Sequence, residues 1–223
     1  MMVIVRIFPN QEIQGCWNRI LDNLDKMSSK NCSPLYLSQQ EKDHFLSLVY
    51  DAEDVESLAD ILVKEIPSLL RPTKTRTIPL LRPAFFRAPK DRPAILERYQ
   101  VALGTRSEET GNIFNHILGL DYPNDAFPTY AAYSFGEYDI LTSMLSTSRN
   151  RLEQFVRENL ESLKGVDSVE VGRINRSVRV APAEMWKKYR ESRYVAMPGA
   201  RREEYDFLEY AAGTGAFREE LET

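Results

Sequence analysis

The 223-residue sequence contains few of the residues from which many active sites are built. It has two cysteines, Cys16 and Cys32, and two histidines, His44 and His116. Two cysteines without a second pair beside them exclude a cysteine-rich zinc site and argue against a disulfide framework, which favours a reducing cytoplasm. Two histidines leave little material for a Ser-His-Asp triad or a multi-histidine metal site. We therefore expect no bound metal and no catalysis of these types.

Long apolar runs and a basic excess are also absent. No segment approaches the roughly 20 apolar residues of a membrane span, and Met1 to Phe8 is too short, and is interrupted by Arg6, to be a secretory signal. The net charge is −4, whereas duplex binding depends on Lys and Arg that neutralise phosphates. No P-loop, nucleophile elbow or Rossmann pattern occurs. We expect a cytoplasmic protein without direct nucleic-acid or membrane contacts, and enzyme activity is not indicated.

The sequence does contain a pattern that occurs twice. Glu41-Lys42-Asp43, followed by an apolar run at 45–50 and a helical stripe at 55–69, is matched by Glu137-Tyr138-Asp139 and similar segments at 140–145 and 152–163. A period of roughly 95 residues is the size of one small domain and too long for a solenoid unit. The pattern therefore predicts two similar domains in tandem.

Each half has apolar spacings that alternate between periods of two and of 3.6, which predicts the order β-α-β-β-α-β. In the first half the elements are a strand at 2–8, a helix at 13–27, strands at 35–37 and 44–50, a helix at 54–69 and a strand at 73–81. In the second half they are a strand at 99–103, a helix from 107, strands at 130–135 and 140–145, a helix at 152–163 and a strand at 169–180. Gly172 lies where the alternation of the last strand changes phase, which predicts a β-bulge.

The predicted fold class is α+β, with tandem ferredoxin-like domains that have both helices on one face of each sheet. Apolar residues on the other face would be covered by a second sheet, giving a dimeric α/β barrel within one chain or between two. We assign to that face Tyr99, Val101, Tyr130 and Leu141. The predicted boundaries are a first domain at 1–84, a stiff linker at 85–96 that adds to neither core, a second domain at 97–183 and a C-terminal helical extension at 184–223.

The second half carries a resemblance to a known family. Its strand Ala132 to Phe135 leads into the hairpin Gly136-Glu137-Tyr138-Asp139, and a later helix ends at Leu163-Lys164-Gly165-Val166 before the strand Val169-Glu170-Val171. Over about residues 97–183 this order resembles the effector-binding domain of the Lrp/AsnC (feast/famine) family of regulators. The first half fits the same topology as a diverged copy that keeps Asp43.

The resemblance implies a function and partners. Members of the family form barrel-like dimers and larger oligomers, and they bind small effectors such as amino acids near this hairpin. Those that regulate transcription carry an N-terminal helix-turn-helix, whereas this sequence begins with a predicted strand. We therefore expect a homo-oligomeric, non-enzymatic protein that senses a small molecule or assembles with regulators, and that acts in transcriptional or metabolic regulation without direct DNA binding or a cofactor.

The predicted ligand site is the hairpin itself, with Tyr133, Gly136, Glu137, Tyr138 and Asp139 as its residues. Gly136 can adopt a positive φ and bring backbone amides close to a ligand. Asp139 can hold an ammonium group or cap a turn, and Tyr138 offers a rigid apolar face with a hydroxyl. The alternative is that the hairpin is a tight turn oriented by Asp139.

One further alternative concerns His116. Its spacing from Ile113 and Leu120 places it on the apolar side of a helix, where a satisfied core histidine is the default. Chlorite dismutase-like haem proteins are also tandem β-α-β-β-α-β repeats, and the position of His116 is similar to that of their proximal haem ligand. This resemblance implies a haem protein or peroxidase in which His116 binds the iron, and it requires an apolar pocket and a partner for the second ring nitrogen.

Overall fold

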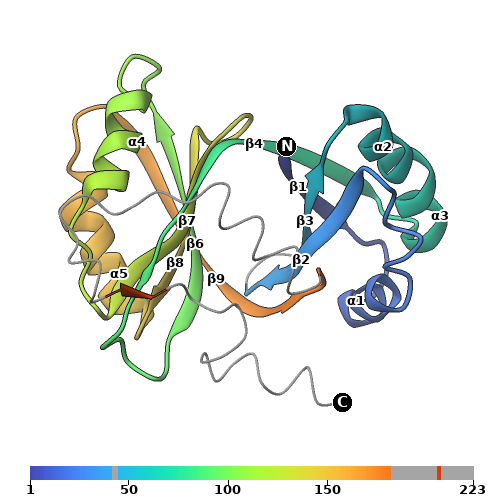
Figure 1. Cartoon of the computed structure of the whole chain (residues 1–223), viewed down its shortest axis with the longest axis horizontal. Helices are drawn as coiled ribbons and strands as arrows, with labels where there is room; N and C mark the ends of the chain where they lie inside the picture. The colour runs from blue at the N-terminus through green and yellow to red at the C-terminus, as the bar shows by residue number, and fades with distance from the viewer. Residues whose placement is uncertain (42–44, 182–204, 207–223) are drawn as a thin grey trace. The chain divides into compact units, whose positions relative to one another are not determined.

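A computed structural model describes residues 1–41, 45–181 and 205–206 (Figure 1). Asp43, the first residue of the strand predicted at 44–50 and most of the extension predicted at 184–223 lie outside these residues. Within them the chain forms mixed α+β structure with antiparallel sheet, as predicted. No helix in these ranges is both long and apolar enough to cross a membrane.

The chain divides into two compact units. Unit 1 comprises Met1–Leu81 and the described part of Asn175–Trp186. Unit 2 comprises Arg82–Ile174 and the described part of Lys187–Thr223. Each division falls inside a strand, because β4 (Lys74–Phe85) and β9 (Val166–Arg179) both begin in one unit and end in the other.

In unit 1 the strands lie in the order β4–β1–β3–β2, and the last part of β9 follows β2. Helices α1 to α3 lie on one face of this sheet (Figure 1). The bounds are β1 Met2–Phe8, α1 Ile13–Asp22, β2 Cys32–Gln40, β3 Leu46–Ala52, α2 Val55–Asp60, a π-helical turn Ile61–Glu65 and α3 Ile66–Leu70.

The core of unit 1 follows from alternation along its strands. Val3, Val5 and Ile7 of β1 are completely buried on the face that the helices cover, where Trp17 of α1 and Leu58 of α2 pack against them. The second helix begins where predicted, because the Asp54 carboxylate accepts a 2.6 Å hydrogen bond from the backbone N–H of Ser57. Among the residues that the structure describes, no helix lies on the opposite face of this sheet, which is called here the helix-free face.

In unit 2 the strands lie in the order β9–β6–β8–β7, with α4 and α5 on one face (Figure 1). The bounds are β6 Glu97–Thr105, α4 Thr110–Gly119, β7 Ala126–Ser134, β8 Ile140–Ser146, α5 Arg149–Val156 and a π-helical turn Arg157–Glu161. A two-residue strand, β5 (Ala88–Pro89), pairs with β10 (Tyr205–Asp206). The helical prediction is therefore wrong at Tyr205 and Asp206.

Two predictions about the sheet of unit 2 are wrong. Tyr99 and Val101 do not lie on the helix-free face, because both are buried in the core with Ile113 of α4 and Phe155 of α5. Gly172 is not a bulge, since it pairs in register with Gln100, and the irregularity lies instead between Gly104 and Thr105. The change of phase marks the place where β9 passes from unit 2 into unit 1 after Ile174.

The segment predicted as a linker contributes to a core. Phe86, Ala88 and Leu96 are buried in the cluster that contains the helices of unit 2. The ring of Phe86 meets Tyr122 edge-on, with centroids 5.9 Å apart. The backbone N–H of Phe86 also donates to the carbonyl of Thr129 at 3.0 Å. Residues 85–96 are therefore part of unit 2 and more than a spacer.

Candidate functional site

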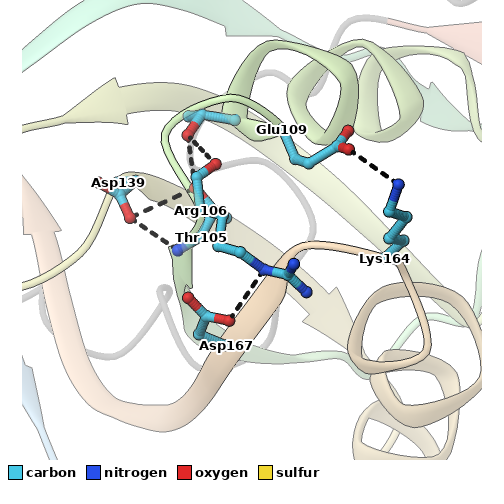
Figure 2. A network of polar contacts seen from close by, with 7 residues as sticks. Thr105, Arg106, Glu109, Asp139, Lys164 and Asp167 are labelled. Carbon is cyan, nitrogen blue, oxygen red and sulfur yellow. Dashed lines mark hydrogen bonds and ion pairs between the residues drawn. The ribbon is translucent and has the colours of Figure 1, made fainter.

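The predicted hairpin lies between β7 and β8, and Asp139 fixes it to the neighbouring strand. One carboxylate oxygen of Asp139 accepts hydrogen bonds from the backbone N–H of Thr105 at 2.7 Å and from the Thr105 hydroxyl at 3.3 Å (Figure 2). The backbone N–H of Asp139 donates to the carbonyl of Leu103 at 2.9 Å. These contacts extend the pairing of β6 with β8 to the residue before β8, so they assign Asp139 an anchoring role.

The same network extends to the turn between α5 and β9. The backbone N–H of Arg106 donates to the carbonyl of Gly165 at 2.8 Å, and the Arg106 guanidinium lies 3.6 Å from Asp167. Lys164 lies 3.7 Å from the Glu109 carboxylate at the start of α4 (Figure 2). Gly165 has a φ of +92°, as expected for the glycine that ends the preceding helix. The network joins three chain connections at one end of the unit.

The other predicted hairpin residues lie near one another, but each makes different contacts within the protein. Tyr133 stacks on Phe114 of α4 with ring centroids 4.1 Å apart, and the Tyr138 hydroxyl donates to Glu170 of β9. Gly136 has a φ of +130°, and Glu137 is exposed. Contacts within the protein thus account for Tyr133, Tyr138 and Asp139. The binding of an effector by these five residues stays a prediction.

His116 does not lie in the core, and that prediction is wrong. The buried face of α4 is formed by Ile113, Phe114 and Ile117, whereas His116 is exposed. Because successive helical residues are turned by about 100°, His116 lies roughly 100° from the centre of that face. Its spacing of three residues from Ile113 was therefore not enough to place it on the buried side. An axial haem ligand needs apolar surroundings, and an exposed side chain does not have them. The binding of haem iron by His116 stays a prediction.

A second group of functional side chains lies on the helix-free face of unit 1 and is called here the cation–aromatic cluster. It consists of Arg6, Phe8, Phe45, Lys74 and Arg76. The Phe8 and Phe45 rings have centroids 5.1 Å apart. The Arg6 guanidinium lies 4.9 Å from the Phe45 centroid, and Lys74 Nζ lies 4.5 Å from the Phe8 centroid. The Arg76 guanidinium lies 5.8 Å from the Phe8 centroid.

Strand register places this cluster at one end of the face. On β1 and β4, Arg6 pairs with Arg76 and Phe8 pairs with Lys74. Lys74 and Arg76 are exposed, whereas Arg6 is 8% exposed. Two of the three cations therefore lie in solvent and the third is buried in the sheet.

The row of Arg6 is polar across the sheet. Arg6 pairs with Ser47 of β3, and Ser47 pairs with Ser38 of β2. Both serines are buried. The next row toward the other end is apolar, with Ile4 paired to Ile78 on one side and to Val49 on the other. Rings, aliphatic surface, hydroxyls and cations on one face can hold a flat anionic ligand.

The cluster was not among the predicted sites, although the sequence contains a local signal for it. Arg6 interrupts an apolar strand, and Lys74 and Arg76 are two residues apart, which places them on the same face of a strand. The pairing of β1 with β4 supplies the information that the sequence lacks.

Comparison with known proteins gives structural similarity alone. No family model matches the chain, and no curated protein matches it. A structure of the siroheme decarboxylase NirDL in complex with an iron-uroporphyrin III analogue has a TM-score of 0.56 and 9% identity, covering 86% of this chain and 78% of that chain. A second NirDL structure gives a TM-score of 0.55 and 8% identity over the same shares.

A mutant chlorite dismutase from Candidatus Nitrospira defluvii is less similar, with a TM-score of 0.46 and 10% identity over 84% of this chain and 94% of that chain. At these identities the two NirDL structures show the fold alone. The resemblance to Lrp/AsnC regulators stays a prediction, because no family model matches.

The NirDL comparison corrects the expectation that the chain has no cofactor. The fold resembles that of a protein whose complex holds an iron-uroporphyrin analogue, so the fold is one associated with haem-like groups. Among the residues that the structure describes, no group of three or more His, Cys, Asp and Glu side chains could hold a metal ion.

Proposed function

We propose that this protein binds a carboxylate-bearing tetrapyrrole on the helix-free face of unit 1. The observation that carries the proposal is the cation–aromatic cluster, in which three cations lie against two aromatic rings. The similarity of fold to NirDL, whose complex holds an iron-uroporphyrin III analogue, supports the same ligand class. This proposal replaces the predicted amino-acid sensor as the function that the contacts favour.

Each part of the face has a chemical role in this proposal. Phe8 and Ile78 are half-buried and offer apolar surface to a flat macrocycle, with the buried side chains of Phe45 and Ile4 beside them. Lys74 and Arg76 are exposed and can pair with carboxylates at its rim. A bound metallotetrapyrrole would supply the metal, and the side chains named here would orient the ring and neutralise its charge.

The order of the elements within each unit supports a duplicated fold. Both units have the element order β-α-β-β-α-β, and both place their own four strands in the order fourth, first, third, second. In both, a side chain caps the second helix, since Asp54 accepts from Ser57 and Ser148 accepts from Arg151. We infer that the units are copies of one ferredoxin-like domain. Closure of their sheets into a barrel stays a prediction.

The proposal is tested by titrating the protein with iron-uroporphyrin III and following the Soret absorbance. We expect a saturable spectral change, because the ligand would move from water to an aromatic surface. We expect His116→Ala to give the same titration, since His116 is exposed on α4 and away from the core of its unit. A spectrum that shows no saturable change would overturn the proposal, and a change lost in His116→Ala would assign binding to α4 instead.

A further inference from the structure

The helical segment from α2 to α3 in unit 1 (Figure 1) exposes a row of apolar side chains. Val55 of α2 and Val63 of the π-helical turn are 65% and 71% exposed. Ala59 lies between them and is half-buried, and Pro67 in the first turn of α3 is exposed. The four residues follow one another at intervals of four, which places them on one side of the segment. They are called here the apolar row.

The corresponding row of unit 2 is charged. Counted from the capping serine of α5, the same positions are Arg149, Glu153, Arg157 and Glu161. Arg149 and Glu153 form an ion pair at 2.6 Å, and Arg157 and Glu161 are exposed. A charged and solvated row is thus compatible with this fold, so the folding of unit 1 does not require the apolar row.

Exposed valines bring no benefit to a single chain at these positions. Valine has a lower helix propensity than arginine or glutamate, because its branched side chain loses freedom against the preceding turn. A side chain that remains in water also gains none of the free energy of burial. Scattered apolar residues are ordinary on protein surfaces, but apolar residues that recur at helical spacing are the pattern by which one helix docks on another surface. The apolar row therefore indicates a surface that a partner covers.

A row of charges runs beside the apolar row and changes sign along the segment. Glu56, Asp60 and Lys64 are exposed, and Lys64 Nζ lies 2.7 Å from the Asp60 carboxylate. The row is acidic at its amino-terminal end and cationic at its carboxyl-terminal end. Two copies placed antiparallel would bring the cationic end of one beside the acidic end of the other, so the row is complementary to itself. An anionic membrane surface does not match it, because its acidic residues outnumber its lysine.

We propose that the apolar row is the contact surface of a homodimer, in which the helical segments of two copies pack antiparallel about a two-fold axis. Two-fold dimers are the commonest symmetric assemblies, and each subunit contributes the same patch to the interface. With the axis between Ala59 and Val63, Ala59 of each copy faces Val63 of the other. Lys64 of each copy then lies between the levels of Glu56 and Asp60 in the other copy. The inference goes beyond the proposed function and does not depend on it.

The size of the contact sets the expected affinity. A helix rises by about 1.5 Å per residue, so the segment from Val55 to Leu70 is about 24 Å long. Two such segments bury less than about 1,200 Å² in total, which is the range of weak and reversible complexes. We therefore expect a dissociation constant between about 10 μM and 1 mM.

Sedimentation equilibrium of the full chain, without any tetrapyrrole, measures the association. We expect the weight-average mass to rise from 25.7 kDa toward twice that value as the protein concentration approaches about 1 mM. Val63→Glu should weaken the dimer by about tenfold or more, since it places a charge inside the apolar contact. The matched control is Asn150→Glu, which makes the same change of charge at an exposed position of α5 and should leave the association unchanged.

Charge reversal tests the antiparallel arrangement. Lys64→Glu should weaken the dimer, because it places a carboxylate between the acidic residues of the other copy. Adding Glu56→Lys should recover part of the loss, because the new lysine of one copy would lie beside the new glutamate of the other. A double variant that associates no better than Lys64→Glu alone would overturn the antiparallel pairing.

Two further results would overturn the homodimer itself. One is a mass of 25.7 kDa at every concentration, which would leave the apolar row to a partner of another kind. The other is association that Val63→Glu and Asn150→Glu weaken equally, or that neither changes, because the copies would then meet through a different surface.

Discussion

The carboxylate of Asp139 and the backbone N–H of Thr105 lie 2.7 Å apart, and this bond joins the β7–β8 hairpin to the end of β6. This contact gives Asp139 a structural role at the end of the hairpin that does not depend on a ligand. It also makes the structural role of Asp139 measurable.

Asp139→Ala is expected to destabilise the protein by about 1–3 kcal/mol, because it removes the acceptor of the Thr105 N–H in a half-buried place. Asp139→Asn keeps an oxygen acceptor and should cost less. The free energy of unfolding in urea measures both. Asp121→Ala, at an exposed position, is the control and should change it by less than about 0.5 kcal/mol. Equal stability of Asp139→Ala and the control would remove the anchoring role.

Gly165→Ala should destabilise the protein more than Gly136→Ala. Both glycines have a positive φ, so alanine is strained at each by about 1–3 kcal/mol. A Cβ at Gly165 would also lie 2.5 Å from Cβ of Glu109, whereas a Cβ at Gly136 meets nothing within 4 Å. Overpacking adds about 1–3 kcal/mol at Gly165 alone. Thermal unfolding of the two variants compares them, and the reverse order would contradict the geometry of the α5–β9 turn.

Arg176 should be a stabilising residue of unit 1 through its side chain. Its guanidinium lies 4.1 Å from the Trp17 ring centroid and donates to Gln39 at 2.8 Å and to Gln14 at 2.5 Å. Arg176→Ala is expected to cost about 1–2 kcal/mol, from a cation–π contact and two hydrogen bonds.

Arg176→Lys should recover part of the loss, since a lysine keeps the charge but lacks the planar fork. Urea unfolding followed by tryptophan fluorescence measures the series. Arg157→Ala, which removes an exposed arginine from unit 2, is the matched control. If Arg157→Ala lowered the free energy of unfolding as much as Arg176→Ala, the change in net charge would be responsible, and not the contacts of Arg176 with Trp17, Gln39 and Gln14.

The thiol of Cys32 should be unreactive in the native protein. Burial, with smaller contributions from the nearby carboxylates of Asp54 and Asp51, raises its pKa from 9.0 to about 11. Because the raised pKa disfavours the thiolate only in the folded state, this contribution to stability is present below pH 9 and is lost as pH rises toward 11.

Ellman's reagent at pH 8 should therefore find no reactive thiol in the folded protein and two in urea, since Cys16 is buried as well. Cys32→Ser would be expected to weaken the fall of stability between pH 9 and 11. Rapid labelling of the native protein would show that the site around Cys32 opens readily.

The regular elements were predictable because their signals are local. The run rich in Val and Ile at 2–8 marks a strand, and Asp54 marks the start of a helix. Alternation separates the two faces of a strand but does not say which one the helices cover. That is why Tyr99 and Val101 were assigned to the wrong face.

The functional residues were harder to predict because they depend on pairing between distant segments. The opposition of Arg6 and Arg76 requires the register of two strands about 70 positions apart, which no local pattern contains. The predicted hairpin residues do lie together, but Thr105, which holds Asp139, comes from another strand. His116 was misplaced because one helical spacing was considered without the whole apolar face.

The central claim, that a tetrapyrrole lies on the helix-free face of unit 1, is tested most directly by paramagnetic broadening of isoleucine methyl signals. Iron-uroporphyrin III would be added to protein with labelled isoleucine methyl groups, with the metal-free porphyrin as the diamagnetic control. We predict selective broadening of Ile4 and Ile78, which lie on that face beside the cation–aromatic cluster. Broadening confined to Ile113, Ile117 and Ile140 in the core of unit 2 would contradict the account.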